Sequence, residues 1–254
     1  MQESLYQQLI EIEDDHWWFS YRQYLVLDFI RKQTSNRNLK TLDLGAGTGG
    51  NIRFLKKYFT DIRGLERSQT AIDISKTKLT PKIFNGDLND LALFGKQNGR
   101  FDLITLFNVL YHKSIADPEK TVSEIRNLLN PGGILVFTEP AFNILMRSHD
   151  KIGHGDKRFK IKEAEAWLRN TGFENIQSSY FNLPSFFPAL GLSIFEKIKP
   201  KKTNHSSNTV GELETNSILN QSMKTVMNLE RGWINSIGKL PFGVTLIAAG
   251  RIPS

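Results

Sequence analysis

The fold of this 254-residue chain is decided by residues 40–50, KTLDLGAGTGG. A β-rich run ends there, and the helical pattern of residues 49–58 begins among the glycines. Three alternating glycines, Gly45, Gly47 and Gly49, remove the Cβ atoms that would keep a ligand away from the backbone N–H groups. The stretch therefore predicts a ligand-binding turn between a strand and a helix, a feature that dinucleotide-binding folds share.

Short β-rich runs and amphipathic helices alternate on both sides of this turn. The predicted strands are residues 40–44, 62–66, 82–85, 101–107, 133–138, 173–181 and 243–252. The predicted helices within this alternation are residues 49–58, 68–76, 118–129 and 162–170. Strands joined by crossover helices indicate a parallel sheet covered on both faces, so we expect an α/β fold.

The remaining segments flank the alternation, and we expect a single domain over residues 1–254. Its parts are a helical segment (1–38), the α/β core (39–181), a helical insertion (182–239) and the final strand (240–254). Within the insertion, the polar run 200–215 is the best candidate for a mobile loop.

The chain contains no cysteine, which excludes disulfides, thiolate zinc sites and cysteine nucleophiles. No apolar run approaches the roughly 18 residues that a membrane span needs. The N-terminus also lacks the basic start and apolar stretch of a signal peptide. We therefore expect a cytoplasmic protein.

The chain is basic, with a net charge of +7 and a pI near 9.5. Such a charge is compatible with nucleic acid, an anionic membrane surface or an acidic substrate. The basic residues are scattered, however, with one dense cluster at 197–202, directly after the apolar run 186–195. Residues 186–202 fit either an amphipathic surface element with a basic tether, which would give peripheral membrane contact, or a helix followed by a solvated loop.

Two carboxylates accompany the glycine turn. Asp43 stands two positions before the first glycine, and Glu66 ends the next predicted strand. The glycine spacing is G-x-G-x-G, and a carboxylate at Asp43 would repel a pyrophosphate but suit a ligand that carries ammonium and sulfonium charges. The Glu66 carboxylate can accept hydrogen bonds from both hydroxyls of a ribose.

With these residues the chain resembles the class I S-adenosylmethionine-dependent methyltransferases. The matching motifs are D-L-G-A-G-T-G at 43–49, the acidic strand end at Glu66, N-G-D-L at 85–88, F-D-L-I at 101–104 and L-N-P-G-G at 129–133. The resemblance implies a Rossmann-like, doubly wound sheet of seven mostly parallel strands with an antiparallel last strand. It also implies an N-terminal helical lid, a helical insertion between the last two strands, S-adenosyl-L-methionine as cofactor and S-adenosyl-L-homocysteine as product.

The resemblance further implies which residues form the donor site. The glycine loop would cradle the methionine part near the Asp43 carboxylate, and Glu66 would bind the ribose. Asp87 and Leu88 would border the adenine. The complete predicted set is Asp43, Gly45, Ala46, Gly47, Gly49, Glu66, Arg67, Asp87, Leu88, Phe107 and Asn108.

A narrower resemblance covers nearly the whole chain. A bacterial subgroup of the HWWF type, similar to methyltransferase types 11 and 12, has an N-terminal H-W-W-F-x-x-R, a P-A…L-x-S-x-H-D…H-x-x-R-[YF] segment and a closing L-P-F-G-x-S-L-x-A. Here these are His16–Arg22, Pro140–Phe159 and Leu240–Ala248, with Thr245 in place of the serine. The acceptors of this subgroup are diverse, so the fold and the donor carry over and the acceptor does not.

The acceptor is expected beside the residues that follow the strand 101–107, because ligands of open α/β sheets bind outside the carboxyl ends of the strands. Many related methyltransferases resemble D-V-L-E-H here, whereas this chain has Asn108 and Tyr111 with a matching His112. His112 is a candidate base for an O–H or N–H acceptor, or a hydrogen-bonding residue of the pocket wall. Tyr111 is a candidate acceptor contact.

Three further histidines fall in segments expected near the acceptor. His16 and His149 complete the candidate catalytic residues, and His154 is a candidate acceptor contact. His149, Asp150 and His154 fit a metal site, a histidine–aspartate hydrogen bond that orders the loop, or a base that a carboxylate orients. We assign no metal to them, and we expect Arg158 to anchor the loop by an ion pair.

The stretch EDDHWWFSYR, residues 13–22, places two tryptophans side by side on a predicted helix, where neighbouring residues point about 100° apart. One helical stripe contains Trp17, and the adjacent stripe contains Trp18 and Arg22. One stripe can pack onto the domain while the other closes the pocket, so Trp17, Trp18 and Arg22 are predicted substrate contacts. The alternative is that both tryptophans only dock a terminal helix.

The predicted function is transfer of a methyl group from S-adenosylmethionine to oxygen or nitrogen of a small organic acceptor, in specialised-metabolite, glycan or cofactor biosynthesis. Positioning the two reactants supplies much of the acceleration of such an in-line displacement. One alternative is a lipid-linked or membrane-associated, quinone-like acceptor, and another is a non-catalytic S-adenosylmethionine-binding scaffold. Nucleic acid is not expected, since no N-P-P-Y or D-P-P-Y signature follows the strand 101–107. The oligomeric state stays open.

Overall fold

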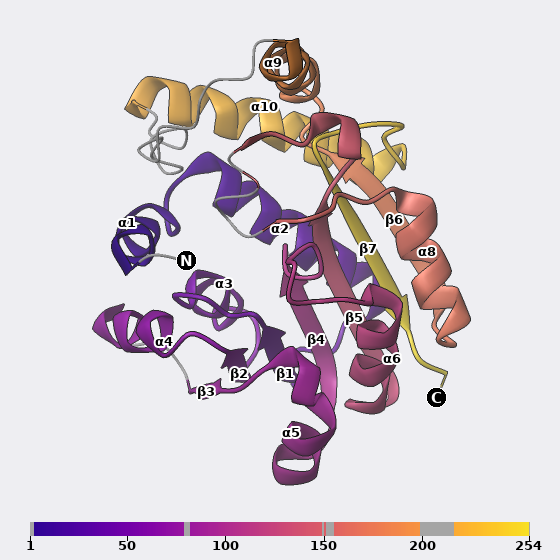
Figure 1. Ribbon diagram of the computed structural model, residues 1–254. Coiled ribbons are helices and arrows are strands. Elements are labelled where there is room, and N and C mark those ends of the chain that lie inside the picture. The colour runs from indigo at the N-terminus through magenta and orange to yellow at the C-terminus, as the bar shows by residue number, and fades with distance from the viewer. Residues whose placement is uncertain (1–2, 79–81, 149, 151–154, 199–215, 254) are drawn as a thin grey trace.

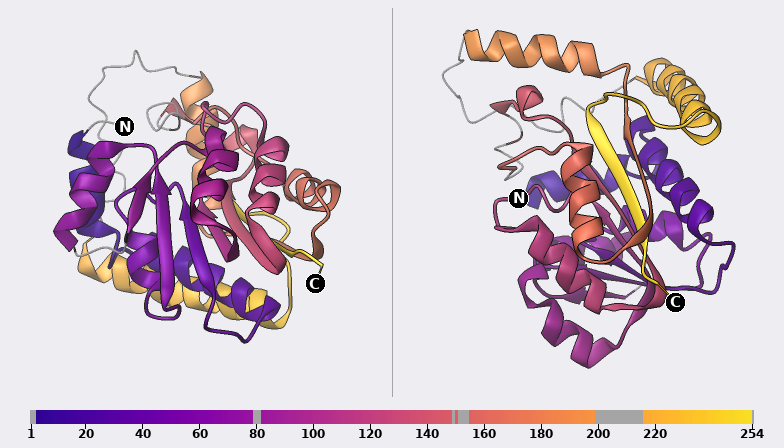
Figure 2. Two further views of the ribbon diagram at one scale, coloured as in Figure 1. Left: turned by 90° about the horizontal axis from the view of Figure 1, so that it is seen from below. Right: turned by 90° about the vertical axis from the view of Figure 1, so that its right-hand side faces the viewer.

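A computed structural model of the chain describes residues 3–78, 82–148, 150, 155–198 and 216–253. These residues form three layers, with a twisted sheet between two layers of helices (Figures 1 and 2). The polar run 200–215, predicted to be a mobile loop, lies outside the described residues. None of the helices in the described part of the chain is long and apolar enough to cross a lipid bilayer.

The described residues build a seven-stranded sheet in the order β3-β2-β1-β4-β5-β7-β6. The strands are β1 (Lys40–Leu44), β2 (Asp61–Glu66), β3 (Ile83–Asn85), β4 (Phe101–Phe107), β5 (Leu129–Pro140), β6 (Glu174–Phe181) and β7 (Thr245–Arg251). Strands β1 to β5 pair in parallel, whereas β7 runs antiparallel to both β5 and β6. The predicted fold class, with its antiparallel last strand and the helices inserted before it, is confirmed.

Helices connect the strands and flank the sheet. They are α1 (Glu3–Ile12), α2 (Trp17–Gln33), α3 (Gly50–Leu55), α4 (Gln69–Ser75), α5 (Leu91–Asn98), α6 (Pro118–Asn127), α8 (Ile161–Asn170), α9 (Phe186–Ile198) and α10 (Ser217–Ser236). Single 3₁₀ turns occur at η1 (Lys76–Lys78), η2 (Leu88–Asp90) and η3 (Asn143–Leu145). Local signals start several helices: Asp117 accepts the Lys120 N–H at 3.0 Å to cap α6, and Pro118 takes its first position.

Two differences from the predicted elements have local causes. Helix α5 was not predicted, because its eight residues bury only Leu91 and Phe94 and include a glycine, which leaves a weak periodic signal. The glycine is needed there, since a Cβ on Gly95 would lie 2.5 Å from Leu128 Cδ2. The predicted helical segment at the N-terminus is divided into α1 and α2 by a turn that ends at His16.

The two faces of the sheet carry separate hydrophobic cores. Helices α5, α6 and α8 cover one face, where Phe101, Phe137 and Trp167 belong to the core. Helices α2, α3 and α10 cover the other face, with Leu25 and Ile247 in the second core (Figure 2). Helix α2 is thus a structural helix of the domain for most of its length.

The carboxyl ends of β1, β2, β4 and β5 meet at one edge of the sheet, because these strands are parallel. The beginning of α2, the glycine loop and the residues after β4 and β5 come together at that edge. Helices α9 and α10, the insertion before the last strand, lie at the same end of the molecule (Figure 1). We expect ligands to bind at this edge.

Candidate active site

The glycine loop adopts a conformation that requires glycine. Gly45, Gly47 and Gly49 have φ angles of +72°, +54° and +84°, in the left-handed region. A Cβ on Gly45 would also lie 2.6 Å from Val109 Cγ2, so the loop packs tightly against the segment after β4. The Gly45 N–H donates to Leu65 O at 2.8 Å, which fixes the loop to the end of β2.

Glu66 lies directly beside this loop. Its Oε2 accepts the Gly47 N–H at 2.8 Å, and its Oε1 accepts the Ser68 N–H at 2.8 Å. The carboxylate therefore joins the glycine loop to the start of α4. The sequence prediction that Glu66 belongs to the donor site agrees with this position, although contact with a ribose remains a prediction.

Asp43, the second predicted carboxylate, is fully buried at the end of β1. Its Oδ1 accepts a hydrogen bond from Thr105 Oγ1 at 2.7 Å, while its Oδ2 is buried and has no hydrogen-bond partner among the described residues. Burial raises the pKa of Asp43 to about 7, although the Thr105 hydrogen bond and the charge of Arg22 lower it. An acceptor atom with no donor inside the protein indicates a site for an external donor.

Arg22 brings the opposite charge to the same region. Arg22 is buried, with an exposed fraction of 6%. Its Nε has no hydrogen-bond partner among the described residues. Its guanidinium lies over the rings of Phe107 at 5.3 Å, Phe19 at 5.6 Å and Trp18 at 5.8 Å. Burial lowers the pKa of Arg22 to about 10, although Asp43 raises it, so the group keeps its charge.

Arg22 forms no ion pair within 4.0 Å in the part of the chain that the structure describes. A buried guanidinium without a carboxylate is costly, and ligands commonly supply the missing partner. Asp43 and Arg22 thus present one unpartnered acceptor and one unpartnered donor of opposite charge beside the same glycine loop.

Glu139 is a site residue that the sequence prediction missed. It is fully buried at the end of β5, and its carboxylate accepts the backbone N–H groups of Val109 at 2.9 Å, Leu110 at 2.7 Å and Tyr111 at 3.1 Å. Burial raises the pKa of Glu139 to about 8, although these three N–H groups lower it. The rule that identified Glu66, an acidic residue at the carboxyl end of a predicted strand, would also have identified Glu139.

The segment after β4 is therefore held in one conformation. Asn108 has a φ of +60°, its N–H donates to Thr138 O at 2.8 Å, and Thr138 Oγ1 donates to its Oδ1 at 2.9 Å. Burial and the charge of Glu139 raise the pKa of Tyr111 to about 12, so its phenol stays protonated and is able to donate a hydrogen bond to a ligand. His112 is half-buried and pairs through its backbone with Gly155.

The predicted lid residues have structural partners as well. His16 Nδ1 accepts the Trp18 N–H at 3.2 Å and thereby caps α2, a role that the sequence prediction did not foresee. The Trp17 N–H donates to Asn220 Oδ1 of α10 at 2.7 Å. The Trp18 ring stacks on Phe181, with centroids 5.8 Å apart and planes at 20°. Both indoles are half-buried, so they can dock α2 on the domain and still contact a ligand with their exposed parts.

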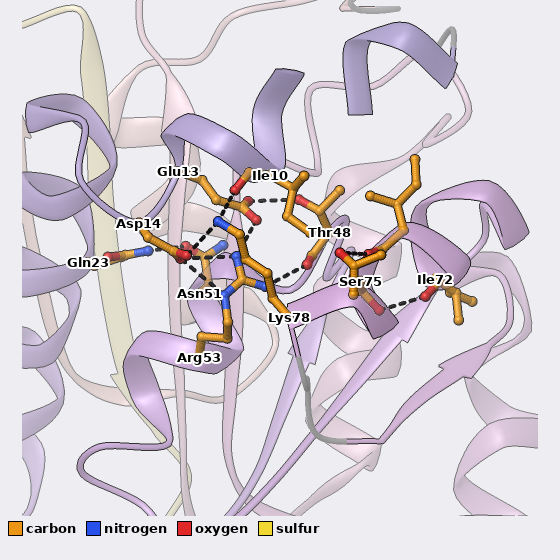
Figure 3. A network of polar contacts seen from close by, with 12 residues as sticks. Ile10, Glu13, Asp14, Gln23, Thr48, Asn51, Arg53, Ile72, Ser75 and Lys78 are labelled. Atoms are coloured by element: carbon orange, nitrogen blue, oxygen red, sulfur yellow. Dashed lines mark hydrogen bonds and ion pairs between the residues drawn. The ribbon is translucent and has the colours of Figure 1, made fainter. Parts of the chain in front are cut away.

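A polar latch, defined as Glu13, Asp14, Thr48, Arg53 and Lys78, joins the turn after α1 to the glycine loop (Figure 3). Thr48 Oγ1 donates to Glu13 Oε2 at 2.8 Å, and Arg53 pairs with Glu13 and Asp14. A Cβ on Gly50, the first residue of α3, would lie 2.6 Å from Glu13 Cδ. The N-terminal segment therefore lies directly on the loop that is expected to bind the donor.

Asp87 and Leu88, the residues predicted to border the adenine, follow the carboxyl end of β3. The Asp87 carboxylate accepts the Asn89 N–H at 2.9 Å and pairs with Arg67 at 3.4 Å on the surface. Leu88 is buried in the first hydrophobic core. Ala46 is buried under the loop, and its N–H donates to Leu65 O at 3.1 Å. Their contact with adenine remains a prediction.

The loop after β5 is anchored as expected. Arg158 Nη2 donates to Asp150 Oδ1 at 2.9 Å, and both side chains are about nine-tenths buried. The prediction that Arg158 anchors the loop by an ion pair is confirmed. Asp150 also accepts the Arg147 N–H at 2.8 Å. His149 and His154 lie outside the described residues, so their predicted roles stay predictions.

The chain belongs to a family of methyltransferase domains, whose model matches residues 18–178. The matched region contains the glycine loop, Arg22, Glu66 and Glu139. The predicted methyltransferase family is therefore confirmed.

Individual proteins of known name are similar to the chain. The ubiquinone biosynthesis O-methyltransferase of Coxiella burnetii is 29% identical over 114 residues, which are 44% of this chain and 48% of that protein. The chain thus spans about half the length of this curated relative.

Two solved structures share the fold. An S-adenosylmethionine-dependent methyltransferase from Clostridium acetobutylicum superposes with a TM-score of 0.59 at 13% identity, covering 99% of this chain and 97% of that chain. Phosphoethanolamine N-methyltransferase 2 of Haemonchus contortus, in complex with S-adenosyl-L-methionine, gives a TM-score of 0.54 at 17% identity, covering 90% and 52%.

Proposed function

We propose that this chain transfers a methyl group from S-adenosylmethionine to an oxygen or nitrogen atom of a small organic acceptor. The observation that carries the proposal is the pair of buried, oppositely charged groups beside the glycine loop, Asp43 and Arg22. The methionine part of the donor has an ammonium group and a carboxylate on one carbon. An unpartnered carboxylate oxygen and an unpartnered guanidinium nitrogen are complementary to those two charges.

The test separates the amino-acid part of the donor from its nucleoside. S-adenosylhomocysteine carries the ammonium and the carboxylate, whereas 5′-methylthioadenosine lacks both. Replacing Arg22 with glutamine should weaken S-adenosylhomocysteine binding in calorimetry by roughly tenfold or more, because a hydrogen bond to a charged group contributes about 1.5–3 kcal/mol. Binding of 5′-methylthioadenosine should change by less than about twofold on the same reasoning.

The matched control is Arg31→Gln, since Arg31 lies on the same helix but is exposed and covers the Tyr58 ring. This variant should bind both nucleosides as the unmodified chain does. If the unmodified chain binds neither S-adenosylmethionine nor S-adenosylhomocysteine at micromolar concentration, the proposed function is wrong.

Deprotonation of the acceptor is assigned to His112, which follows β4 on the segment that Glu139 holds. A neutral imidazole can take the proton of an O–H or N–H acceptor as the methyl group leaves the sulfonium. The protonated Tyr111 next to it would orient the acceptor by donating a hydrogen bond. Water is excluded from the transfer by the aromatic residues at the start of α2, which is the proposed role of Trp17 and Trp18.

A second candidate keeps the chemistry and places the acceptor on a lipid carrier. The apolar helix α9 at the same end of the molecule favours it. Comparing a phenolic acceptor that bears a prenyl tail with the same phenol without the tail would distinguish the two: a KM at least roughly tenfold lower for the tailed acceptor supports the lipid carrier. We further propose that the chain belongs to the HWWF subgroup and acts in the cytoplasm.

A further inference from the structure

Helix α9 exposes a face that consists of apolar residues. With about 100° of rotation per residue, the buried Ser193 marks the inner side of the helix. The residues on the opposite side are all apolar and exposed: Phe187, Pro188, Gly191, Leu192, Ile194, Phe195 and Ile198. The exposed fractions reach 63% for Phe187 and 72% for Ile198. Such a face on a monomeric protein marks an interaction surface.

The helix is held firmly enough to present this face. Ser193 Oγ donates to Ile144 O at 2.5 Å, and Glu196 pairs with Arg147 at 2.8 Å on the inner side. The polar groups of α9 are thus used for attachment to the domain, and the apolar residues are left on the outside. The apolar face is a consequence of how α9 docks and not of a loosely attached helix.

Helix α10 carries a second apolar stripe at the same end of the molecule (Figures 1 and 2). Its exposed apolar residues are Ile218, Leu219, Val226, Leu229 and Trp233, and the exposed Ile237 follows directly after the helix. Trp233 is 50% exposed, and tryptophan is enriched where proteins meet the interface of a bilayer.

The charges around these faces indicate the kind of partner. Glu196, the acidic residue of α9, is neutralised by Arg147, and the Lys197 ammonium donates to Ile144 O at 3.0 Å. In α10 the acidic Glu230 is buried and bonded to Tyr21. Neither helix therefore presents an unpaired carboxylate, and the chain as a whole has a net charge of +7.

We propose that the apolar face of α9, with the stripe of α10, docks on the surface of an anionic lipid membrane. Apolar side chains would enter the region between headgroups and acyl chains, while the net positive charge of the chain attracts it to anionic headgroups. A second copy of the chain is a poorer occupant, because it would bring the same positive charge against this surface. The surface belongs to the end of the molecule that holds the expected ligand edge, so docking would turn that edge towards the membrane (Figure 1).

The proposal goes beyond the methyl transfer itself and is tested by flotation of the full chain with vesicles. Vesicles of phosphatidylcholine containing phosphatidylglycerol should retain the protein, and vesicles of phosphatidylcholine alone should retain much less. Raising the salt concentration should weaken retention, because the headgroup attraction is screened. The double variant Leu192→Gln with Ile198→Gln should lower the bound fraction at least roughly fivefold.

The matched control is Leu93→Gln, which removes an equally exposed leucine from α5 at the far end of the molecule (Figure 1). It should float as the unmodified chain does. Absence of flotation with anionic vesicles at low salt overturns the proposal, as does equal flotation of the double variant. A dimer in gel filtration that the double variant abolishes would assign the face to a second copy instead. Calorimetry with S-adenosylhomocysteine on every variant reports on the donor site separately.

Discussion

Replacing Asp43 with asparagine should stabilise the folded chain and weaken donor binding at the same time. Asp43 is fully buried and accepts one hydrogen bond, from Thr105 Oγ1, while its second oxygen has no partner among the described residues. Asparagine has nearly the same shape, and its carbonyl oxygen can accept the Thr105 hydrogen bond. The substitution therefore removes a buried charge with little change in packing.

The magnitude follows from the pKa of the group. Burial raises the pKa of Asp43 from 3.8 to about 7. Between these two values the folded state binds more protons than the unfolded state, so stability falls as the pH rises, by about 1.4 kcal/mol per pH unit. Above about pH 7 both states are ionised, and the ionised carboxylate destabilises the fold by about 4 kcal/mol. The asparagine variant lacks this destabilisation at every pH.

Urea unfolding of both proteins at two pH values measures the effect. The unfolding free energy of Asp43→Asn minus that of the unmodified chain should grow by about 3 kcal/mol between pH 5 and pH 8. The control is Asp90→Asn, an exposed carboxylate, for which the difference should be the same at both pH values. A difference for Asp43→Asn that does not change with pH would refute the reasoning.

Donor binding should change in the opposite direction. At pH 8 the variant should bind S-adenosylhomocysteine roughly 10- to 150-fold more weakly, because a hydrogen bond between charged groups contributes about 1.5–3 kcal/mol. The affinity of the unmodified chain should fall below about pH 7, where Asp43 must lose a proton to receive the ammonium group, and that of the variant should not. Equal affinities of the two proteins would show that Asp43 does not contact the ammonium group.

Three further substitutions test the supports of the site. Glu139→Gln should lower the unfolding free energy by about 1–3 kcal/mol in urea, because its amide can no longer accept all three backbone N–H groups. Gly45→Ala should lower the melting temperature through a strained φ and a 2.6 Å contact, whereas Gly191→Ala, in open space on a helix, should raise it slightly. Glu230→Ala should cost about 3 kcal/mol in chemical unfolding, because it leaves the buried Asn182 N–H, the half-buried Leu183 N–H and a phenol without their acceptor. An unchanged midpoint in any of the three would contradict the assigned contacts.

The residues that could be predicted from the sequence owe their positions to local chemistry. Asp43 and Glu66 are fixed by the strand ends on either side of the glycine loop, and both strand ends are visible in the sequence. Arg22 was predicted as a substrate contact because helical spacing placed it on the stripe of Trp18, and the structure buries it beside Asp43, a residue of the predicted donor site. Short-range periodicity was enough in each case.

The residues that were missed depend on contacts between distant parts of the chain. Glu13 reaches Thr48 across 35 residues, and Glu230 reaches Tyr21 across 209. No helical or strand period connects such pairs, since their approach follows from the packing of whole elements. Glu139 differs from these residues, because its position at a strand end could be predicted from the sequence. Its three N–H donors could not, since they come from a segment about 30 residues earlier.

These contacts also divide the predicted N-terminal lid into a fixed part and a part able to move. Helix α2 has Leu25, Leu27 and Ile30 fully buried. Helix α10 holds it as well, since Glu230 accepts the Tyr21 hydroxyl and Arg231 pairs with Asp28, so moving α2 would open the second core. Among the described side chains of α1, by contrast, Ile10 alone is buried. Its other attachments are packing against α4, the Lys78 hydrogen bond to Ile10 O and the polar latch. In the latch the exposed pairs of Asp14 contribute little, whereas the pair of Arg53 with Glu13 is largely buried. We therefore expect α1 and the turn after it to move more readily than α2 when the donor enters, while Arg22 and the two tryptophans stay in place on α2.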